Sequence, residues 1–360
     1  MRYTEFLESF KRFLAGCPVE DLDENGRYLF LSDLHMGNGG SRDDLAANRS
    51  LVGAMLRRWY LEKDYYLVLN GDIEDLNKFR LKDIWSSWEE VLSLIQAFAD
   101  RGKLRKIVGN HDYDLLLEKD YPWKLYEGIV LRYRGNRVFV FHGHQASSLY
   151  VKFDSLSEFL VRWLVKPLHI RNSSVSKDSR RRFATERRIY RAARAYGLMA
   201  IAGHTHRPLF ESLSKFDNIR ILMENLLRRY VDAGEGEKEG IEKQVRLYRS
   251  EMERLAGERA SRKKTQSLYG AGPFLIPCVF NSGSATGKHG LTALEIREGR
   301  IYLVYWTTGP DEHPYLESEK LAVDSIDDAW YRYVIHTERL DSVFTRIRLL
   351  GCNAEGCPID

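Results

Sequence analysis

Acidic, amide and imidazole side chains follow directly on five short apolar runs of this chain. The runs are residues 28–31, 65–69, 107–108, 138–141 and 199–202. Their length, their β-branched and aromatic residues, and the Gly or Asp beside them predict buried strands. Ligands of open α/β sheets gather beyond the carboxyl ends of the strands. We therefore expect one polar site made of Asp33, His35, Asp72, Asn110, His111, Asp112, His142, His144, His204 and His206.

The mixture of residue types in this predicted site suits a pair of divalent metal ions. A carboxylate can bridge two ions, neutral imidazoles fill further coordination positions, and an amide oxygen adds a ligand without adding charge. Two such ions hold a phosphoryl group and lower the pKa of a bound water towards neutral pH. Any single Asp-x-His or Asn-His pair is more often a capped turn or a hydrogen-bonded core histidine. Five segments in order, each at a strand end, favour a common site.

The ordered motifs resemble those of the calcineurin-like metallophosphoesterase superfamily. They are Asp33-x-His35, Gly71-Asp72-x-x-Asp75, Gly109-Asn110-His111-Asp112, His142 and Gly203-His204-x-His206. The resemblance covers residues 27–306 and implies an α/β fold, a four-layer α/β/β/α sandwich with helical insertions. It also implies a dinuclear metal centre, with Asp33, His35 and His206 on one ion, Asn110, His142 and His204 on the other, and Asp72 as the bridge.

The same resemblance implies two catalytic residues. His111 would stabilise charge at the phosphoryl group or protonate the leaving oxygen, and Asp75 would orient it. A carboxylate favours the protonated form of a neighbouring imidazole, so the pair suits a general acid. Two roles stay open for His144 and Arg207: contact with substrate phosphate, or support of the ligating histidines from outside the coordination shell. The expected ions are two Mn²⁺, with Fe, Zn and Mg as alternatives that such mixed ligands also accept.

The leading function is hydrolysis of a phosphate ester or pyrophosphate bond in a phosphorylated small molecule or lipid. The motif Gly203-His-Thr-His-Arg-Pro208 and the long segment after His142 are similar to UDP-2,3-diacylglucosamine hydrolases. The sequence departs from those enzymes at His111, where they carry Arg, and in residues 211–271, which they lack. One alternative is a phosphodiesterase or nuclease acting on nucleic acid, which is less favoured. The other is a non-catalytic scaffold, which the complete set of ligands disfavours.

The composition is that of an ordinary globular protein with one basic segment. Of 360 residues, 44% are hydrophobic and 29% are charged, and the net charge is +4. This charge is too small to indicate a nucleic-acid partner by itself. Residues 147–198 hold twelve Lys or Arg and four Asp or Glu. The positive charge therefore gathers next to the predicted site.

The cysteines and the apolar stretches of the sequence bear on where in the cell the protein resides. The scattered residues Cys17, Cys278, Cys352 and Cys357 are expected to be reduced thiols. The N-terminal residues lack the apolar run of a signal peptide, and no stretch approaches a membrane span. We expect a cytoplasmic protein, for which peripheral contact with a membrane surface is compatible with the sequence.

The chain divides into an N-terminal helix (1–26), a metallophosphoesterase domain (27–306) and a C-terminal helical extension (307–360). Within the domain, residues 147–198 are expected to form a helical cap and residues 211–271 a charged helical arm. The cap segment carries an apolar stripe over 150–164 and a basic run over 180–191. Alternatively, the stripe packs on a sheet and the arginines face water. The arm shows two helical patterns separated by residues 232–240, which predicts a helical hairpin.

The remaining elements follow from periodicity. Helices are expected over residues 3–14, 44–61, 83–100 and most of 326–350. Strands are expected over 60–70 and 103–109, and a β-hairpin over 291–306. Residues 277–284 should pair with the strand before Gly203.

Overall fold

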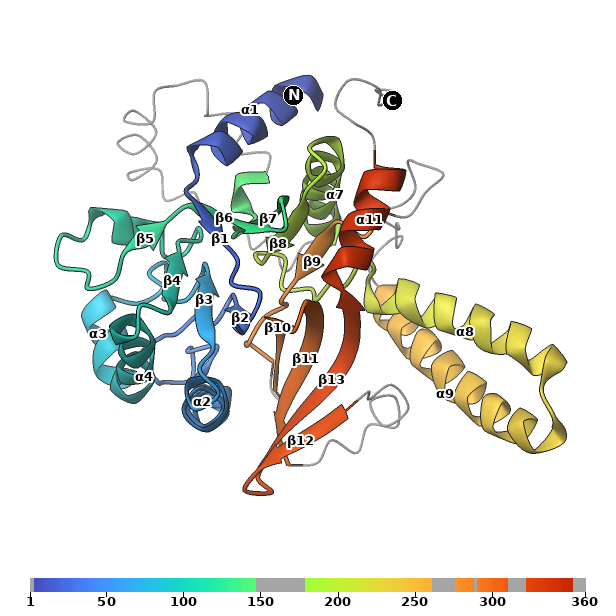
Figure 1. The fold of residues 1–360 in the computed structure, drawn as a ribbon. Helices are drawn as coiled ribbons and strands as arrows, with labels where there is room; N and C mark the ends of the chain where they lie inside the picture. The colour runs from blue at the N-terminus through green and yellow to red at the C-terminus, as the bar shows by residue number, and fades with distance from the viewer. Residues whose placement is uncertain (1–2, 147–178, 261–275, 288–289, 310–321, 352–360) are drawn as a thin grey trace.

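The computed structural model describes residues 3–146, 179–260, 276–287, 290–309 and 322–351. Its strands form two sheets (Figure 1). The larger sheet has the order β12 (Ala322–Ile326), β13 (Trp330–Arg339), β11 (Arg300–Thr308), β10 (Leu291–Arg297), β2 (Tyr28–Leu31), β3 (Tyr66–Asn70), β4 (Leu104–Ile107) and β5 (Leu125–Tyr126). The smaller sheet has the order β1 (Val19–Asp21), β6 (Gly128–Tyr133), β7 (Asn136–Phe141), β8 (Met199–Ala202) and β9 (Val279–Asn281).

The strand directions bring the polar loops to shared edges. In the larger sheet β2, β3, β4 and β5 are parallel, so the loops after β2, β3 and β4 leave at the same edge. In the smaller sheet β7, β8 and β9 are parallel, so the loops after β7 and β8 also leave together. The pairing of β8 with β9 confirms the predicted partnership of the strand before Gly203 with residues 277–284. The β10–β11 hairpin is likewise present.

Helices cover the outer face of each sheet, and the two inner faces pack together. On the larger sheet lie α2 (Arg49–Met55), α3 (Leu81–Ser87) and α4 (Glu89–Asp100), with a 3₁₀ turn over 46–48 before α2 and a short π-helix over 56–61 after it. Leu29 and Leu31 of β2 face these helices, whereas Tyr28 and Phe30 face the smaller sheet. This alternation follows from the two-residue period of a strand. The arrangement confirms the predicted four-layer α/β/β/α sandwich (Figure 1).

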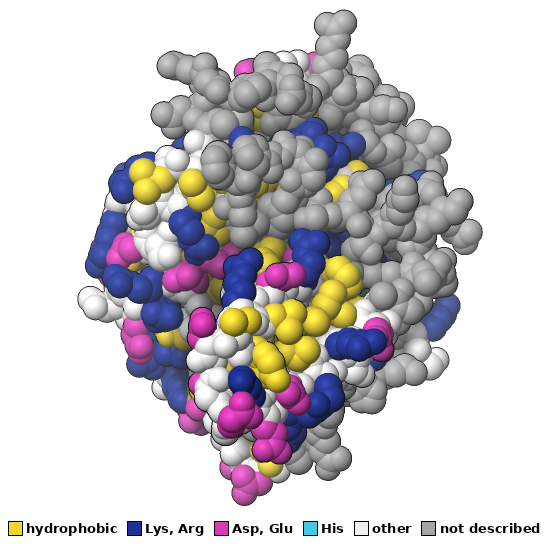
Figure 2. Space-filling model, turned by 90° about the vertical axis from the view of Figure 1, so that its right-hand side faces the viewer, with side chains coloured by type: hydrophobic (Ala, Val, Ile, Leu, Met, Phe, Trp, Pro, Cys, Tyr) yellow, Lys and Arg dark blue, Asp and Glu magenta, His cyan; other side chains and the backbone are white. Residues whose placement is uncertain are grey.

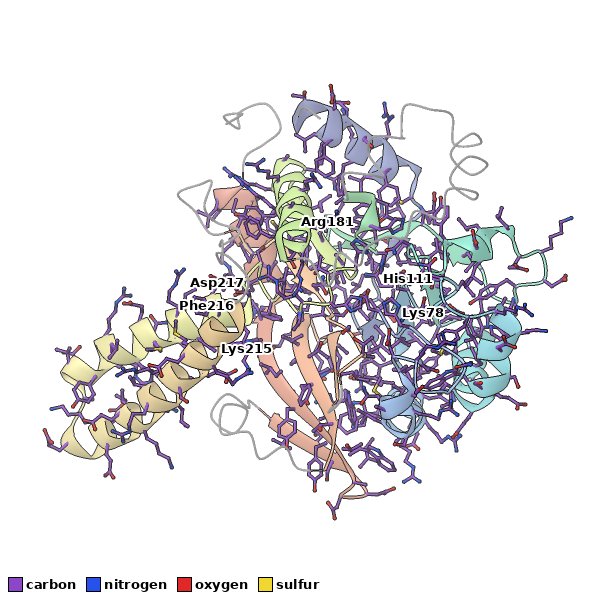
Figure 3. All side chains as sticks on the ribbon, turned by 180° about the vertical axis from the view of Figure 1, so that it is seen from behind. Lys78, His111, Arg181, Lys215, Phe216 and Asp217 are labelled. Carbon is purple, nitrogen blue, oxygen red and sulfur yellow. The ribbon has the colours of Figure 1, made fainter. Side chains whose placement is uncertain are left out.

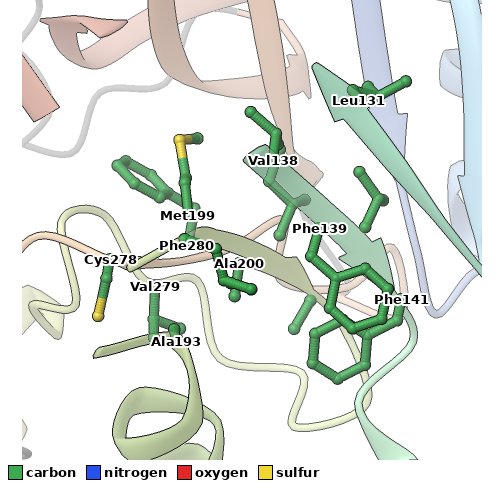
Figure 4. Packing of buried hydrophobic residues seen from close by; sticks show 14 of the residues in the cluster. Leu131, Val138, Phe139, Phe141, Ala193, Met199, Ala200, Cys278, Val279 and Phe280 are labelled. Carbon is green, nitrogen blue, oxygen red and sulfur yellow. The ribbon is translucent and has the colours of Figure 1, made fainter. Parts of the chain in front are cut away.

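On the smaller sheet the outer layer consists of α1 (Tyr3–Gly16) and α7 (Ser179–Ala195). The Phe10 ring of α1 lies 5.6 Å, centroid to centroid, from the rings of both Phe139 and Phe141 on β7. Figure 4 shows these two β7 rings side by side, and Ala193 of α7 near Val279 of β9. Helix α1 is the helix expected over residues 3–14. It is followed by β1, so residues 1–26 contain an edge strand as well.

The C-terminal region differs from the prediction. Residues 326–350 were expected to be mostly helical, and residues 307–360 a helical extension. Instead, β11 runs on to Thr308, and β12 and β13 continue the larger sheet as an antiparallel pair. Only α11 (Leu340–Leu350) is helical there. Residues 330–339 are rich in aromatic and β-branched residues and pair with the open edge of β11, which favours a strand.

The two predicted insertions are described to different extents. The apolar stripe of the cap, residues 150–164, lies outside the described residues. The basic run falls on α7, which packs on the smaller sheet through Ile189, Ala192 and Ala193. The predicted helical hairpin is present as α8 (Lys215–Asp232) and α9 (Glu235–Ala260). None of the helices in the described ranges is both long enough and apolar enough to cross a membrane.

Candidate metal centre

The loops that carry the predicted site residues meet where the two sheets adjoin. The main-chain N–H of Asp33 donates to the carbonyl of Gly71 at 3.0 Å, which joins the loops after β2 and β3. Asn70, the last residue of β3, connects the sheets because its Nδ2 donates to the carbonyl of Phe141 on β7 at 3.1 Å. The loops so assembled bear Asp33, His35, Asp72, Asp75, Asn110, His111, His142, His144, His204 and His206.

Asp33, His35 and His206 form one group of potential metal ligands. Their ligand atoms all lie within 4.8 Å of one another. His206 Nε2 is 3.1 Å from both His35 Nε2 and Asp33 Oδ1, and His35 Nε2 is 3.9 Å from Asp33 Oδ1. Two ligands about 2.1 Å from one tetrahedral ion lie about 3.4 Å apart. The donor atoms and their spacing therefore fit one divalent ion.

Asp72, His142 and His204 form the second group, and all three are buried. His142 Nδ1 donates to the carbonyl of Asn70 at 2.9 Å, so in the neutral ring the lone pair is on Nε2. This Nε2 lies 3.1 Å from Asp72 Oδ2. Among the described residues, His142 Nε2, His204 Nε2 and Asn110 Oδ1 are buried without a hydrogen-bond partner. Such atoms are costly unless something coordinates them, so this group also fits an ion.

Asp72 belongs to the second group and also faces the first. Its Oδ2 is 3.1 Å from His142 Nε2 and 3.9 Å from His35 Nε2, so it faces one histidine of each group. Its Oδ1 accepts the main-chain N–H of His111 at 2.7 Å, which fixes the carboxylate. Burial by itself would raise the pKa of Asp72, but the rings of His142 and His111 outweigh burial and hold this pKa well below its usual value. The carboxylate is therefore ionised and available to bridge.

Asp33 and two histidines have shifted pKa values for related reasons. Burial would raise the pKa of Asp33, but His206 and His142 lower it to about 2. Burial would lower the pKa of His142, but Asp72 and Asp33 raise it to about 9. Burial and the neighbouring His142 lower the pKa of His204 to about 3. The site thus carries two buried carboxylates that attract positive charge.

The backbone at this site is strained. Asp33, His35, Asp72, His204 and His206 have φ values between 51° and 65°, in the left-handed region. Few residues other than glycine adopt this region, because it costs free energy, although Asn, Asp and His do so more often than the rest. Strained residues of this kind cluster at functional sites, where the surrounding structure holds them in place.

A close approach explains one motif glycine. A Cβ atom on Gly109 would lie 2.1 Å from Asp72 Oδ1 and 2.4 Å from the Asp72 main-chain nitrogen. The loop after β4 can therefore reach Asp72 only because residue 109 has no side chain. This approach positions Asn110 and His111 beside Asp72.

His111 and Asp75 form a hydrogen-bonded pair next to the two ligand groups. His111 Nδ1 lies 2.8 Å from Asp75 Oδ1. Burial would lower the pKa of His111, but Asp72 and Asp75 raise it above its usual value. Lys78 Nζ in turn lies 2.9 Å from Asp75 Oδ2, and Figure 3 shows Lys78 and His111 close together. The His111 side chain is 18% exposed, so a substrate can reach it.

His144 and Arg207, whose roles stayed open, have different surroundings. The His144 ring is buried, 5.5 Å from the His142 ring and 6.0 Å from the Tyr113 ring. The Arg207 guanidinium makes a two-pronged ion pair with Glu186, a buried residue of α7. Arg207 therefore already has an anionic partner, which ties the loop after β8 to α7.

A buried ionic network lies behind the candidate ligands and includes Asp112, which was expected in the polar site itself. Lys106 Nζ contacts Glu74 Oε2 at 2.6 Å and Asp112 Oδ2 at 2.9 Å, and all three side chains are fully buried. Asp112 also accepts the main-chain N–H groups of Gly109 and Ile73. The network therefore joins the loop with Asp72 to the loop with Asn110. The one sequence signal was a lysine inside the strand of residues 104–107.

Asn281, the last residue of β9, is a further supporting residue. Its Nδ2 donates to the carbonyl of Gly203 at 2.8 Å and contacts Thr205 Oγ1 at 3.1 Å. It thereby holds the loop that carries His204 and His206. The predicted pairing of residues 277–284 put Asn281 near this loop, but its function there was not predicted.

Comparisons with known proteins complete the description. The model of the calcineurin-like phosphoesterase family matches residues 26–208. A comparison with curated proteins finds no match. Similar solved structures include a phosphoesterase from E. coli (12% identity, TM-score 0.32, 77% of this chain and 91% of that chain). They also include vacuolar protein sorting 29 from Cryptosporidium parvum (11%, 0.32, 88% and 100%) and a dimetal phosphatase from Danio rerio (10%, 0.33, 78% and 96%).

Proposed function

Because the chain belongs to the calcineurin-like phosphoesterases, hydrolases that act on phosphoric esters, we propose that it cleaves a phosphate ester or pyrophosphate bond at a centre of two divalent ions. The observation that carries the proposal is the pair of ligand groups, which adjoin where Asp72 of the second group faces His35 of the first. Asp33, His35 and His206 would hold one ion. Asn110, His142 and His204 would hold the other, and Asp72 would bridge the two.

His111 and Asp75 would carry the proton chemistry. Two bound divalent ions neutralise charge on a phosphoryl group and acidify a water molecule. Asp75 accepts a hydrogen bond from His111 Nδ1, so the protonated ring presents Nε2 as its remaining donor. A raised pKa keeps this proton in place near neutral pH, ready for transfer to the leaving oxygen. Lys78 holds the second oxygen of Asp75 and thereby fixes the orientation of the pair.

The finer points of the proposal rest on general chemistry. We propose Mn²⁺ as the ion, since mixed carboxylate, amide and imidazole ligands suit it, although Fe, Zn and Mg share this property. We propose a phosphorylated small molecule or lipid as substrate, because a net charge of +4 gives little general attraction for nucleic acid. A cytoplasmic location is supported by the free, buried thiols of Cys17 and Cys278.

The test is an activity screen on protein that has been stripped of metal and reloaded. Separate samples receive Mn²⁺, Fe²⁺, Zn²⁺ or Mg²⁺ and are offered a phosphomonoester, a phosphodiester, single-stranded nucleic acid and a lipid-linked pyrophosphate. We expect metal-dependent turnover that is highest with Mn²⁺ and is lost in Asp72→Asn. Turnover that survives metal removal, or that persists in Asp72→Asn, would overturn the proposed centre.

A further inference from the structure

Helices α8 and α9 form an arm that projects from the body of the molecule (Figure 1). The two helices are antiparallel and hold each other through a small core of Ile219, Leu226, Ile241 and Tyr248. At the base of the arm, Lys215 of α8 pairs with Glu251 of α9 at 2.7 Å (Figure 3). The 18 residues of α8 span about 27 Å. The α8 residues of this core, Ile219 and Leu226, lie on the side of α8 that faces α9.

The opposite side of α8 carries a stripe of exposed residues. The outer stripe consists of Ile221, Glu224, Leu227, Arg228 and Val231, each of which lies three or four residues from another member. Residues at this spacing lie on one face of a helix. Ile221 is 37% exposed, Leu227 48% and Val231 79%. Figure 2 looks onto the side from which the arm projects and shows hydrophobic side chains gathered in a patch bordered by charged ones.

The order of residues in the outer stripe is self-complementary. From one end it reads apolar, acidic, apolar, basic, apolar: Ile221, Glu224, Leu227, Arg228, Val231. When two copies of α8 lie antiparallel about an axis near residue 226, Ile221 meets Val231 and Glu224 meets Arg228. The two copies of Leu227 meet near the axis. A parallel arrangement would instead place like charges together.

Self-complementarity of this kind is what a two-fold symmetric interface requires, because the same surface serves both partners. We therefore propose that the outer stripe is a dimer interface, at which α8 packs antiparallel against α8 of a second copy of this chain. Within the described part of the chain, neither Glu224 nor Arg228 forms an ion pair with another residue. Both charges are thus available to a partner copy.

The balanced charge of the arm argues against nucleic acid or a membrane as the partner of the outer stripe. Residues 215–260 contain ten Lys or Arg and ten Asp or Glu. Nucleic acid or an anionic membrane would favour an excess of positive charge, which the arm lacks. An apolar centre with a charged rim is instead the usual composition of a protein interface.

The size of the contact between the two copies of α8 determines how tightly the dimer is expected to form. With Ile221 opposite Val231, the two copies of α8 overlap by about 13 residues and touch over about 20 Å. A contact this short buries less than the roughly 800 Å² per partner of a standard interface. We therefore expect a dimer that forms reversibly with increasing concentration. Sedimentation equilibrium on the full chain over a wide concentration range measures this directly.

Two kinds of variant test the interface itself. Leu227→Glu places a charge at the centre and should raise the dimer dissociation constant at least tenfold, whereas Val323→Glu, at an exposed apolar residue of β12, should leave it unchanged. Glu224→Arg alone and Arg228→Glu alone each bring like charges together and should weaken the dimer. The double variant restores opposite charges across the axis and should recover the dimer.

Recovery of the dimer in the double variant is the test of the antiparallel register. Circular dichroism checks that each variant keeps its helices. A wild-type chain that stays monomeric at all concentrations would overturn the proposal. So would a dimer indifferent to Leu227→Glu, or a double variant as weak as the single ones.

Discussion

The two oxygens of Asp72 have different tasks, and this division shows how the candidate centre is built residue by residue. Oδ1 accepts the main-chain N–H of His111, while Oδ2 faces His142 and His35. A carboxylate fixed in this way keeps one oxygen directed at the potential ions. The His142 ring is oriented in a similar way, because its Nδ1 donates a hydrogen bond to the carbonyl of Asn70. Hydrogen bonds from outside the ligand set orient the ligands.

The assignment of His111 as a proton donor can be separated from a role as a metal ligand. In His111→Gln we expect kcat to fall by about 10²-fold or more, the usual contribution of a positioned acid, with the metal content unchanged. Asp75→Asn should lower kcat by about 10-fold to 100-fold, because it removes an orienting partner. Steady-state kinetics and elemental analysis of the bound metal measure both quantities.

His206→Ala is the matched comparison, since it removes a proposed ligand and should lose metal and activity together. If His111→Gln loses as much metal as His206→Ala, then His111 is a ligand and its assigned role is wrong.

The site residues could be predicted as a set because each follows directly on an apolar run that forms a strand. Residue type and sequence position sufficed to predict that they lie together, whereas their roles as ligands or catalytic groups stay predictions. The contacts of Lys106 and Arg207 could not be predicted, since Glu74 and Glu186 are remote from them in sequence and Asp112 was expected in the polar site instead. Pairings of this kind depend on how elements pack.

At the scale of elements, the loops are held in place by contacts behind the site. Lys106 is buried within β4 between the carboxylates of Glu74 and Asp112. Tyr121 also donates to Glu74, at 2.8 Å. A buried charge is tolerated only when it is paired and hydrogen-bonded. The network therefore makes the positions of the loops after β3 and β4 depend on each other.

Lys106→Met should destabilise the protein by about 3–5 kcal/mol, because it leaves two carboxylates buried without their cation. The double variant Lys106→Met/Glu74→Gln should recover part of this loss, since one uncompensated charge is removed. Lys103→Met, which breaks the pair with the exposed Asp64 and the contact with the Tyr66 ring, should cost less than about 1 kcal/mol. Urea unfolding compares the three variants, and equal losses for Lys106→Met and Lys103→Met would contradict this account.

A second element-scale prediction concerns acid stability. His336 of β13 stacks on Phe210, with ring centroids 5.4 Å apart, and burial lowers its pKa from 6.5 to about 4. Below pH 6.5 the unfolded chain therefore binds a proton that the folded chain does not, and the free energy of unfolding falls until about pH 4. The full difference is worth about 3 kcal/mol.

His336→Phe keeps an aromatic ring beside Phe210 and removes the titration. We expect the variant to gain stability relative to wild type as the pH falls from 6.5 to 4, with little change in that difference between pH 7 and 8. Urea unfolding at a series of pH values gives the result. A constant difference across this range would show that His336 does not contribute to acid sensitivity.

Prediction from sequence was less complete for elements than for residues. The hairpin of α8 and α9 was found because its apolar residues recur at helical spacing over two long stretches. Residues 330–339 were assigned wrongly to a helix, since Tyr333 and Val334 fit an apolar helical face as well as a buried strand. The open edge of β11 favours the strand, because β13 can pair with it. Local sequence carries no signal of such an edge.

At the scale of the whole molecule, the candidate centre joins the two sheets. Asp33, His35, Asp72 and Asn110 follow strands of the larger sheet, whereas His142, His204 and His206 follow strands of the smaller one. Each proposed ion would therefore draw ligands from both sheets. The sequence predicted a single site at strand ends but not this division, because the assignment of strands to sheets depends on their pairing.

Metal binding should consequently stabilise the entire fold, since the unfolded chain separates these ligands. A free ion at 100 times its dissociation constant adds about 2.7 kcal/mol to the free energy of unfolding. We expect Mn²⁺ to raise the unfolding temperature of wild type and of the surface variant Asp100→Asn equally, and a chelator to reverse the rise. In Asp72→Asn the rise should be much smaller, because the ion loses the carboxylate that connects both ligand groups. If Asp72→Asn gains as much stability from Mn²⁺ as wild type does, the ion binds elsewhere and the two sheets are not joined through this site.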